Sequence, residues 1–279
     1  MKSQQEPINW RAIFGIIRKD LRVVMQSKSV VLPMVIVPTL LLVILPLGLA
    51  IAITWFGDSL ENSADIQEIM AMIPESLKAS FGNYTVTQMA GLYILRYMFA
   101  PMYLILPIMT SSVVAADAFA GEKERKTLEA LLYTPTSDFE LFLAKMLGAL
   151  VPGILLAWAS ALLYWLVVDV AVWPLYGWPI LPDSTWLVLA LWVAPAAAAM
   201  GLGATVIVSA RARTFQDAYQ ISGLVVLPIV ALILGQSLGV FFLGTWMALG
   251  VGLVFFLVAA FLAVLGARTL RRSELLARL

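Results

Sequence analysis

Only one short stretch of the chain matches a known catalytic pattern. Gly235-Gln236-Ser237-Leu238-Gly239 fits G-x-S-x-G, in which a serine nucleophile sits on a sharp turn between a strand and a helix. That chemistry needs a histidine base, and the chain contains no histidine. The same residues fit G-x-x-x-G, a close-packing motif of membrane helices. Small residues that permit a tight turn between two membrane spans are therefore the better interpretation.

The residue types that hold metals and carry redox chemistry are missing. The absence of cysteine and histidine excludes disulfides, iron–sulfur clusters, haem ligation by histidine and most zinc sites. No G-x-x-x-x-G-K-[ST] segment occurs, so the chain cannot cradle ATP phosphates in a P-loop of its own. We expect no catalytic, cofactor or metal site in this chain, and any nucleotide energy must come from a partner.

Two charged residues flank an apolar window and could belong to a proton or ion relay. Arg96 and Asp117 enclose roughly twenty residues, which at about 1.5 Å per helical residue match the hydrocarbon layer, about 30 Å thick. Each is therefore expected at one end of a span, with its charge reaching the membrane surface. The spans otherwise lack the carboxylates and lysines that proton-coupled and sodium-coupled carriers use.

The composition places the chain in the membrane class, because 62% of its residues are hydrophobic and 13% are charged. The uncharged run between Asp217 and Arg268 would be about 75 Å long as one helix, so it must cross the membrane twice. We predict an all-α membrane protein, a single domain over 1–279 with six transmembrane helices. Their expected bounds are 30–54, 97–117, 138–168, 185–209, 216–234 and 242–267.

Lysine and arginine in the short connections predict the orientation, because these residues resist translocation. With the N-terminus inside, every lysine and arginine except Lys78 and Arg96 lies on the cytoplasmic side. Six crossings return the tail, 268–279, to that side, so both termini are expected in the cytoplasm. The polar N-terminus and the late first apolar run predict no cleaved signal peptide.

The first extracytoplasmic segment, 55–95, is acidic and amphipathic, and Pro74 is expected to divide it into two short helices. It could cover the exit of a pathway or lie on the outer leaflet.

Residues 1–28 are expected to hold an interfacial helix. Apolar residues recur there at helical spacing, and the four cations between residues 11 and 22 make burial unfavourable. We predict a helix on the inner leaflet with its arginines among the lipid phosphates. The apolar residues are Trp10, Ile13, Phe14, Ile17, Leu21, Val24 and Met25, and the cations are Arg11, Arg18, Lys19 and Arg22.

The inner connection between the second and third spans, 121–135, is the most informative soluble segment. Leu128, Leu131 and Leu132 form one apolar stripe, and charges of both signs surround it. Mixed charge suits an anionic leaflet poorly. We therefore expect a short amphipathic helix that ends at Pro135 and docks onto a cytoplasmic protein.

The same connection carries a family resemblance. The sequence EKERKTLEALLYTP from Glu122 to Pro135, followed by Leu141 and Lys145, resembles the signature of the membrane-spanning permease subunit of type-2 ABC exporters. That signature has an acidic and basic pair, then Thr-Leu-Glu, two leucines and Thr-Pro before the third span. Residues 16–22 and 209–218 are similar to the family's interfacial helix and second inner connection. Lys126 stands where the family has glycine.

The resemblance implies half of an ATP-driven exporter in the inner membrane of a prokaryote. Two permease copies, expected to be identical, would bind two cytoplasmic ABC ATPase subunits, which hold ATP and Mg²⁺. This chain itself would bind no cofactor, and membrane lipids but no nucleic acid would surround it. The segment 121–135 would be the coupling helix that meets the ATPase. Its expected docking residues are Glu122, Glu124, Arg125, Thr127, Leu128, Glu129 and Leu132.

An ATP-independent channel or secondary carrier is the alternative. It would require polar groups facing a pathway at the midplane, for which the chain offers Thr205, Gln220, Ser222 and Gln236. A third hypothesis, an intramembrane enzyme, would have to use Ser237 without a positioned base. The sequence does not identify the substrate.

Overall fold

The computed structural model of the protein describes residues 9–82, 84–126 and 137–269. Within these ranges every element is helical and no strand occurs. Six helical stretches are long and apolar enough to cross a membrane, which confirms the predicted all-helical fold with six spans. The side on which each end lies stays a prediction. In chain order, spans 1 to 6 are Val30–Leu60, Val86–Glu124, Phe139–Tyr176, Ser184–Ser209, Phe215–Ser237 and Thr245–Gly266.

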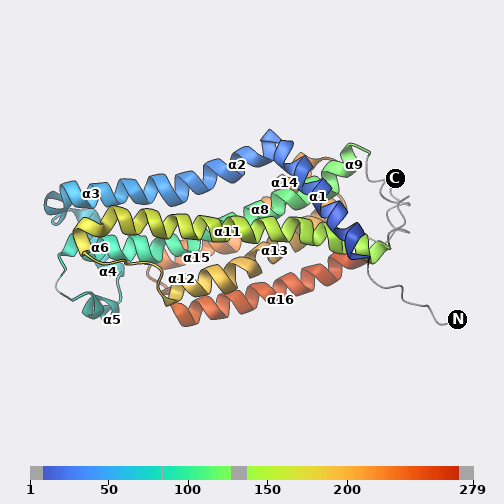
Figure 1. The fold of residues 1–279 in the computed structure, drawn as a ribbon. Helices are drawn as coiled ribbons and strands as arrows, with labels where there is room; N and C mark the ends of the chain where they lie inside the picture. The colour runs from blue at the N-terminus through green and yellow to red at the C-terminus, as the bar shows by residue number, and fades with distance from the viewer. Residues whose placement is uncertain (1–8, 83, 127–136, 270–279) are drawn as a thin grey trace.

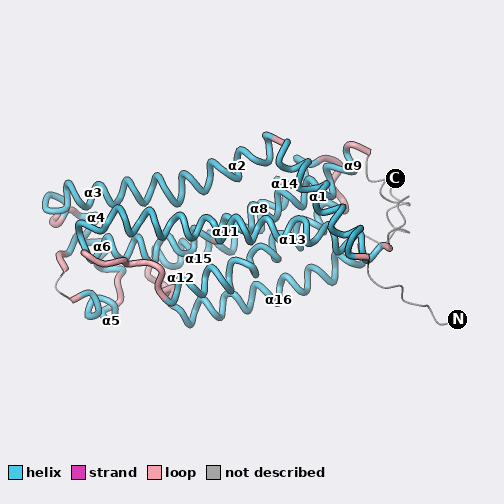
Figure 2. Tube along the Cα trace, viewed as in Figure 1, coloured by secondary structure: helices cyan, strands magenta, loops and turns pink. Residues whose placement is uncertain are grey.

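The six spans run lengthwise beside one another, and a further helix crosses one end of the bundle (Figure 1). That helix is α1, Trp10–Gln26, and only Ser27 separates it from the first helix of span 1. We call the end that it crosses the α1 end. The opposite end, here the α5 end, carries the two short helices predicted around Pro74, which are α4 (Ala64–Met72) and α5 (Glu75–Lys78) (Figures 1 and 2).

Spans 2 and 3 are longer than the sequence predicts. Span 2, predicted at 97–117, covers Val86–Glu124, and span 3, predicted at 138–168, covers Phe139–Tyr176. The predicted bounds stop at charged residues, and those of 97–117 enclose about 30 Å of helix, the thickness of a hydrocarbon layer. The helices themselves continue past those bounds. Residues 55–60 and 86–95 of the predicted extracytoplasmic segment thus belong to spans 1 and 2.

Spans 1, 2, 4 and 5 are built from shorter helices joined by π-helical or 3-10 turns (η), whereas spans 3 and 6 each lie in one continuous helix. Span 1 joins α2 (Lys28–Thr39), η1 (Leu40–Ile44) and α3 (Leu45–Leu60), and span 2 joins α6 (Val86–Tyr93), η3 (Ile94–Met98), α7 (Phe99–Tyr103), α8 (Ile105–Ala116), η4 (Asp117–Gly121) and α9 (Glu122–Glu124). Span 3 lies in α11 (Asp138–Tyr176), and span 4 joins α12 (Ser184–Val188), η5 (Leu189–Val193) and α13 (Ala194–Ser209). Span 5 joins α14 (Phe215–Ser222), η6 (Gly223–Val226) and α15 (Leu227–Ser237), and span 6 lies in α16 (Thr245–Thr269).

Span 2 forms the centre of the bundle. In its most apolar stretch 78% of the residues are buried, against 61% in span 4 and 22% or less in spans 1, 5 and 6. Spans 2 and 4 meet through α8 and α13, where the Ser111 hydroxyl donates to the carbonyl of Ala198 at 2.8 Å. Gly201 lies at the same contact, and a Cβ there would be 2.9 Å from the Ile108 carbonyl oxygen. The core therefore depends on close backbone approach between these two spans.

Three other spans hold the wide turn η3 of span 2. Pro101, in the helix after the turn, has no N–H to donate to the carbonyl of Tyr97. Side chains from other spans instead donate to the carbonyls of the turn, which compensates for the lost helical bonds. The donors are Tyr164 of span 3 to Leu95, Trp186 of span 4 to Arg96 at 2.7 Å, and Gln236 of span 5 to Tyr97 at 2.8 Å.

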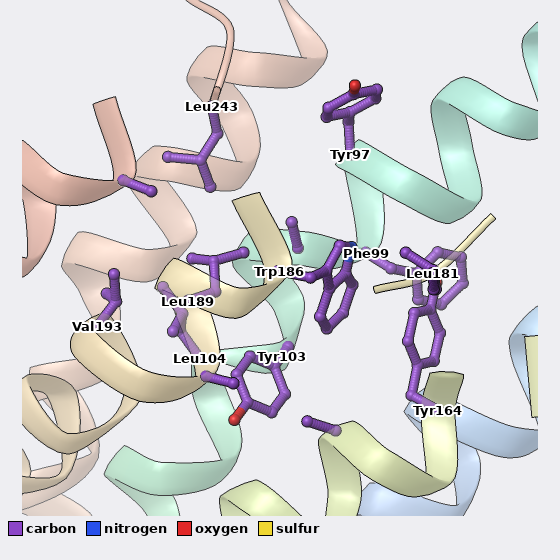
Figure 3. Packing of buried hydrophobic residues seen from close by; sticks show 14 of the residues in the cluster. Tyr97, Phe99, Tyr103, Leu104, Tyr164, Leu181, Trp186, Leu189, Val193 and Leu243 are labelled. Atoms are coloured by element: carbon purple, nitrogen blue, oxygen red, sulfur yellow. The ribbon is translucent and has the colours of Figure 1, made fainter. Parts of the chain in front are cut away.

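Aromatic side chains pack around the same turn. Trp186 is completely buried and stacks on Tyr164, with ring centroids 4.7 Å apart. Its centroid lies 5.5 Å from that of Tyr103, and Figure 3 shows these rings beside Phe99. Aromatic rings bury much area and hold defined mutual orientations. This part of the bundle is therefore a rigid packing centre.

Candidate functional site

The predicted docking segment begins where span 2 ends at the α1 end. Glu122, Glu124 and Arg125 belong to α9 and the turn after it. The structure thus describes the entry into the predicted coupling helix. The other predicted docking residues, which are Thr127, Leu128, Glu129 and Leu132, lie outside the described residues.

Glu122 faces the interior of the bundle instead of the surface. It is 5% exposed, and its carboxylate accepts hydrogen bonds from Lys145 at 2.5 Å and from Lys19. Lys145 belongs to span 3, its side chain is 2% exposed, and it also donates to the carbonyl of Ala118. The structure therefore places Glu122 in an internal ion-pair cluster that joins α1, span 2 and span 3.

Asp20 of α1 completes this cluster of Lys19, Asp20, Glu122 and Lys145. One carboxylate oxygen lies 2.8 Å from Lys19, and the other lies 4.0 Å from Lys145 and has no hydrogen-bond donor within the described residues. Burial raises the pKa of Asp20 above its ordinary value, and the nearby lysines offset this only in part. Burial also opposes the charge of Lys19, but its bonds to Asp20 and Glu122 outweigh burial and raise the pKa of Lys19. The two lysines and two carboxylates balance in charge.

Sequence reasoning assigned Lys19 to the polar face of α1 and gave Asp20 no role. The buried residues of α1 are Ile13, Asp20 and Val24. They are seven and four residues apart, which is the spacing of one helical face. An acid on the apolar stripe was therefore the signal that could have identified Asp20.

The start of α1 is fastened to the start of span 3. The backbone N–H of Asn9 donates to Glu140 at 2.6 Å, and the other carboxylate oxygen of Glu140 accepts from the N–H of Ser137 at 2.8 Å. Ser137 and Glu140 also form the capping box of α11, and Asn9 caps α1. One glutamate thus joins two helix starts, so α1 is held to span 3 at two separate points.

Arg125 and Glu124 hold the turn after α9. Arg125 pairs with Asp117 at 3.0 Å and passes over Gly121, where a Cβ would lie 2.8 Å from the Asp117 carboxylate. Glu124 accepts from the backbone N–H of Phe215 at 2.9 Å, which ties the turn to the start of span 5. Both side chains remain partly or largely exposed.

The prediction that Arg96 and Asp117 reach the membrane surface as separate charges is wrong. Asp117 is 5% exposed and paired with Arg125, and Arg96 pairs with Asp183 at 2.8 Å. Asp183 also caps the start of span 4 by accepting from the N–H of Trp186. Neutralising a charge with an opposite one removes the need to reach water. Both charges are therefore paired within the protein.

Lys126 has an unusual backbone conformation for its residue type. Its φ is +56°, a left-handed value that no other non-glycine residue of the described part adopts. Such a conformation costs an L-residue about 1–2 kcal/mol, whereas glycine adopts it freely. The family signature that the chain resembles has glycine at this position. The backbone at Lys126 thus has a conformation that favours glycine.

We expect Lys126→Gly to stabilise the protein by about 1 kcal/mol, since the relief of strain exceeds the greater freedom of glycine in the unfolded chain. Thermal unfolding of the purified protein measures this. Lys123→Gly is the control, because Lys123 is helical and donates to the Ala212 carbonyl at 3.3 Å, so this change should destabilise by about 1 kcal/mol or more. Equal losses in both variants would contradict the prediction.

Three of the four polar residues that a channel or carrier would need donate to backbone carbonyls, and the fourth, Gln220, is exposed. Thr205 donates to the Gly201 carbonyl, Ser222 to the Ala218 carbonyl and Gln236 to the Tyr97 carbonyl. These hydroxyl and amide donors therefore stabilise helices.

Gly235, Gln236 and Ser237 are the last residues of α15, and Gly239, the last residue of the G-x-S-x-G stretch, has φ +67°. A turn between spans 5 and 6 is therefore present, but it begins at Leu238, after the three residues predicted to form it. No group of three metal-binding side chains occurs within the part of the chain that the structure describes.

Comparison with known families decides the class of the protein. Residues 14–247 match the family model described as ABC-2 family transporter protein. The chain belongs to the ABC-2 transporter family. Members of this family are membrane permeases that lack an ATPase domain and generally partner an ABC ATPase. No curated protein matches the permease. The match includes α1 from Phe14 onward, the ion-pair cluster and the predicted docking segment.

Proposed function

We propose that this permease forms the translocation pathway of an ATP-driven exporter in the inner membrane of a prokaryote. Two copies would pair with two cytoplasmic ABC ATPase subunits, which bind ATP and Mg²⁺. The positive charges of the short connections support a cytoplasmic α1 end. The observation that carries the proposal is the ion-pair cluster at the start of the docking segment, because it joins three elements that would have to move together.

The cluster explains how force at the docking segment would reach the membrane. Lys145 links α9 to span 3, and Lys19 links α1 to α9. Glu124 adds a bond to the start of span 5. A displacement of the segment after α9 would therefore carry the ends of spans 2 and 3 together with α1. Glu122 acts in this proposal as an internal anchor, and Glu124 and Arg125 with Thr127, Leu128, Glu129 and Leu132 supply the docking surface.

Replacing one apolar and one acidic residue of the docking surface with cations tests the proposal. We expect Leu128→Arg with Glu129→Lys to abolish both transport and copurification of the ATPase, since an apolar contact and a charge partner are lost together. Membrane insertion and yield should not change. The measurement is the amount of ATPase retained on the affinity-purified permease.

A matched control makes the same kinds of change at the other end of the bundle. Ala71→Arg with Glu68→Lys lies in α4, at the α5 end, and both residues are exposed. This variant should retain the ATPase in the wild-type amount. Normal ATPase retention by the Leu128 and Glu129 double variant would rule out docking at this segment.

A further inference from the structure

The charges of α1 divide into an inward set and an outward set. Lys19 and Asp20 face the bundle and take part in the ion-pair cluster. Arg11, Arg18 and Arg22 are exposed, and none of them makes a salt bridge with another described residue. They are seven and four residues apart, so they form one row along the helix. The outer side of α1 thus carries positive charge that the described part of the chain does not balance.

An exposed apolar row lies directly beside these arginines. Phe14 is 66% exposed and Met25 is 71% exposed, and Leu21 lies between them along the helix. Together with Ile17, Arg18 and Arg22 they line an open groove of about 580 Å³. The groove combines an apolar floor with two guanidinium groups, which is a surface that suits an amphiphile.

The position of α1 places this groove at the edge of the membrane. Span 1 follows α1 after the single residue Ser27. Its exposed apolar residues Leu32, Val35 and Ile36 begin a lipid-facing surface within the first turns of the span. The groove therefore lies where the acyl chains of a leaflet meet its headgroups.

We propose that the groove binds an anionic phospholipid of the leaflet at the α1 end, with its phosphate between Arg18 and Arg22. Residues four apart on a helix are neighbours, so both guanidinium groups can reach one phosphate. Arginine forms paired hydrogen bonds to phosphate oxygens, and the apolar row accommodates the start of an acyl chain. Because α1 is joined to spans 2 and 3 through Lys19 and Glu140, the lipid would also fix the height of the cluster in the membrane.

Native mass spectrometry of the purified permease tests the site. The protein is offered equal amounts of phosphatidylglycerol and phosphatidylcholine with the same acyl chains. The wild type should retain phosphatidylglycerol preferentially. Arg18→Gln with Arg22→Gln should weaken retention of phosphatidylglycerol on the order of 30-fold, since each cation near an anionic headgroup contributes about a factor of five.

The control removes the same charge from the same end of the bundle. Arg211 and Arg213 are exposed in the connection between spans 4 and 5, and Arg211→Gln with Arg213→Gln should keep the wild-type preference. An equal loss in both double variants would show diffuse attraction and overturn the site, as would an unchanged preference after removal of Arg18 and Arg22. Unchanged elution and melting of each variant establish that the fold is intact.

One more outcome distinguishes lipid from protein as the occupant. If the Arg18 and Arg22 double variant kept its lipid preference but lost the copurified ATPase, the groove would be a protein contact and the lipid proposal would fail. The lipid measurement needs neither ATP nor an ATPase. Its failure therefore leaves the proposed export function untouched.

Discussion

Lys145→Met should destabilise the permease by about 3–5 kcal/mol, the usual cost of removing one partner from a buried ion pair. The side chain of Lys145 is 2% exposed and bonds to Glu122 and to the Ala118 carbonyl. Its loss leaves Glu122 and Asp20, both buried, with Lys19 as the remaining cation of the cluster. A fall of about 10 °C in the melting temperature of the purified protein is expected.

A second variant distinguishes charge imbalance from lost packing. Lys145→Met combined with Glu122→Gln removes one charge of each sign, so the remaining Lys19 and Asp20 still balance. The combined variant should melt above Lys145→Met alone, because no uncompensated carboxylate remains. If the combined variant lowered the melting temperature by the sum of the decreases in the two single variants, the role of charge would be contradicted. Lys28→Met, at an exposed position of the same end, should change the melting temperature little.

Gly201→Leu should prevent spans 2 and 4 from packing. A Cβ at Gly201 would lie 2.9 Å from the Ile108 carbonyl oxygen, 2.9 Å from the Ser112 hydroxyl and 3.1 Å from the Ser111 hydroxyl. Two of these three groups belong to short side chains and the first to rigid backbone, so the helices must separate. The bond from Ser111 to the Ala198 carbonyl would be lost with the contact. We expect a loss at or above the upper end of the about 1–3 kcal/mol typical of overpacking.

The yield of monodisperse permease in size-exclusion chromatography and its melting temperature measure this effect. Gly250→Leu in span 6 is the matched control, because nothing lies within 4 Å of a Cβ at that position. Both changes add the same side chain and raise helix propensity equally. Gly201→Leu should lower both the monodisperse yield and the melting temperature, whereas Gly250→Leu should change neither. Similar behaviour of the two variants would show that the contact between spans 2 and 4 tolerates separation.

The number of spans followed from sequence because hydrophobicity and length suffice to identify them. The pairing of Arg96 with Asp183 could not be predicted, because the two residues are far apart in the sequence and only the packed bundle brings them together. The inward direction of Glu122 was also missed. The wide turn η4, Asp117–Gly121, inserts an extra residue into span 2, which rotates every later side chain by about 100°. A regular helical projection therefore assigns Glu122 to the wrong face.

The predicted docking surface is only partly described. Of its residues, Glu124 and Arg125 are placed at the surface, and the function of the segment beyond Lys126 stays a prediction from sequence. The resemblance to the family did contain one structural clue. Glycine in place of Lys126 indicates a left-handed turn between the end of span 2 and the docking segment, and φ at Lys126 has such a value.

Hydrogen bonds from three other spans fix span 2 at the turn η3, so span 2 would pivot about this turn if it tilted. Tyr164, Trp186 and Gln236 hold its carbonyls from different directions, so this point of the helix can neither slide nor rotate alone. From Arg96 to Glu124 the lever arm is about 42 Å at the helical rise, and a swing of about 5° carries its tip by about 4 Å. A rotation about η3 would therefore displace the end of span 2 at Glu124 by several ångströms while the aromatic side chains packed around η3 hardly moved.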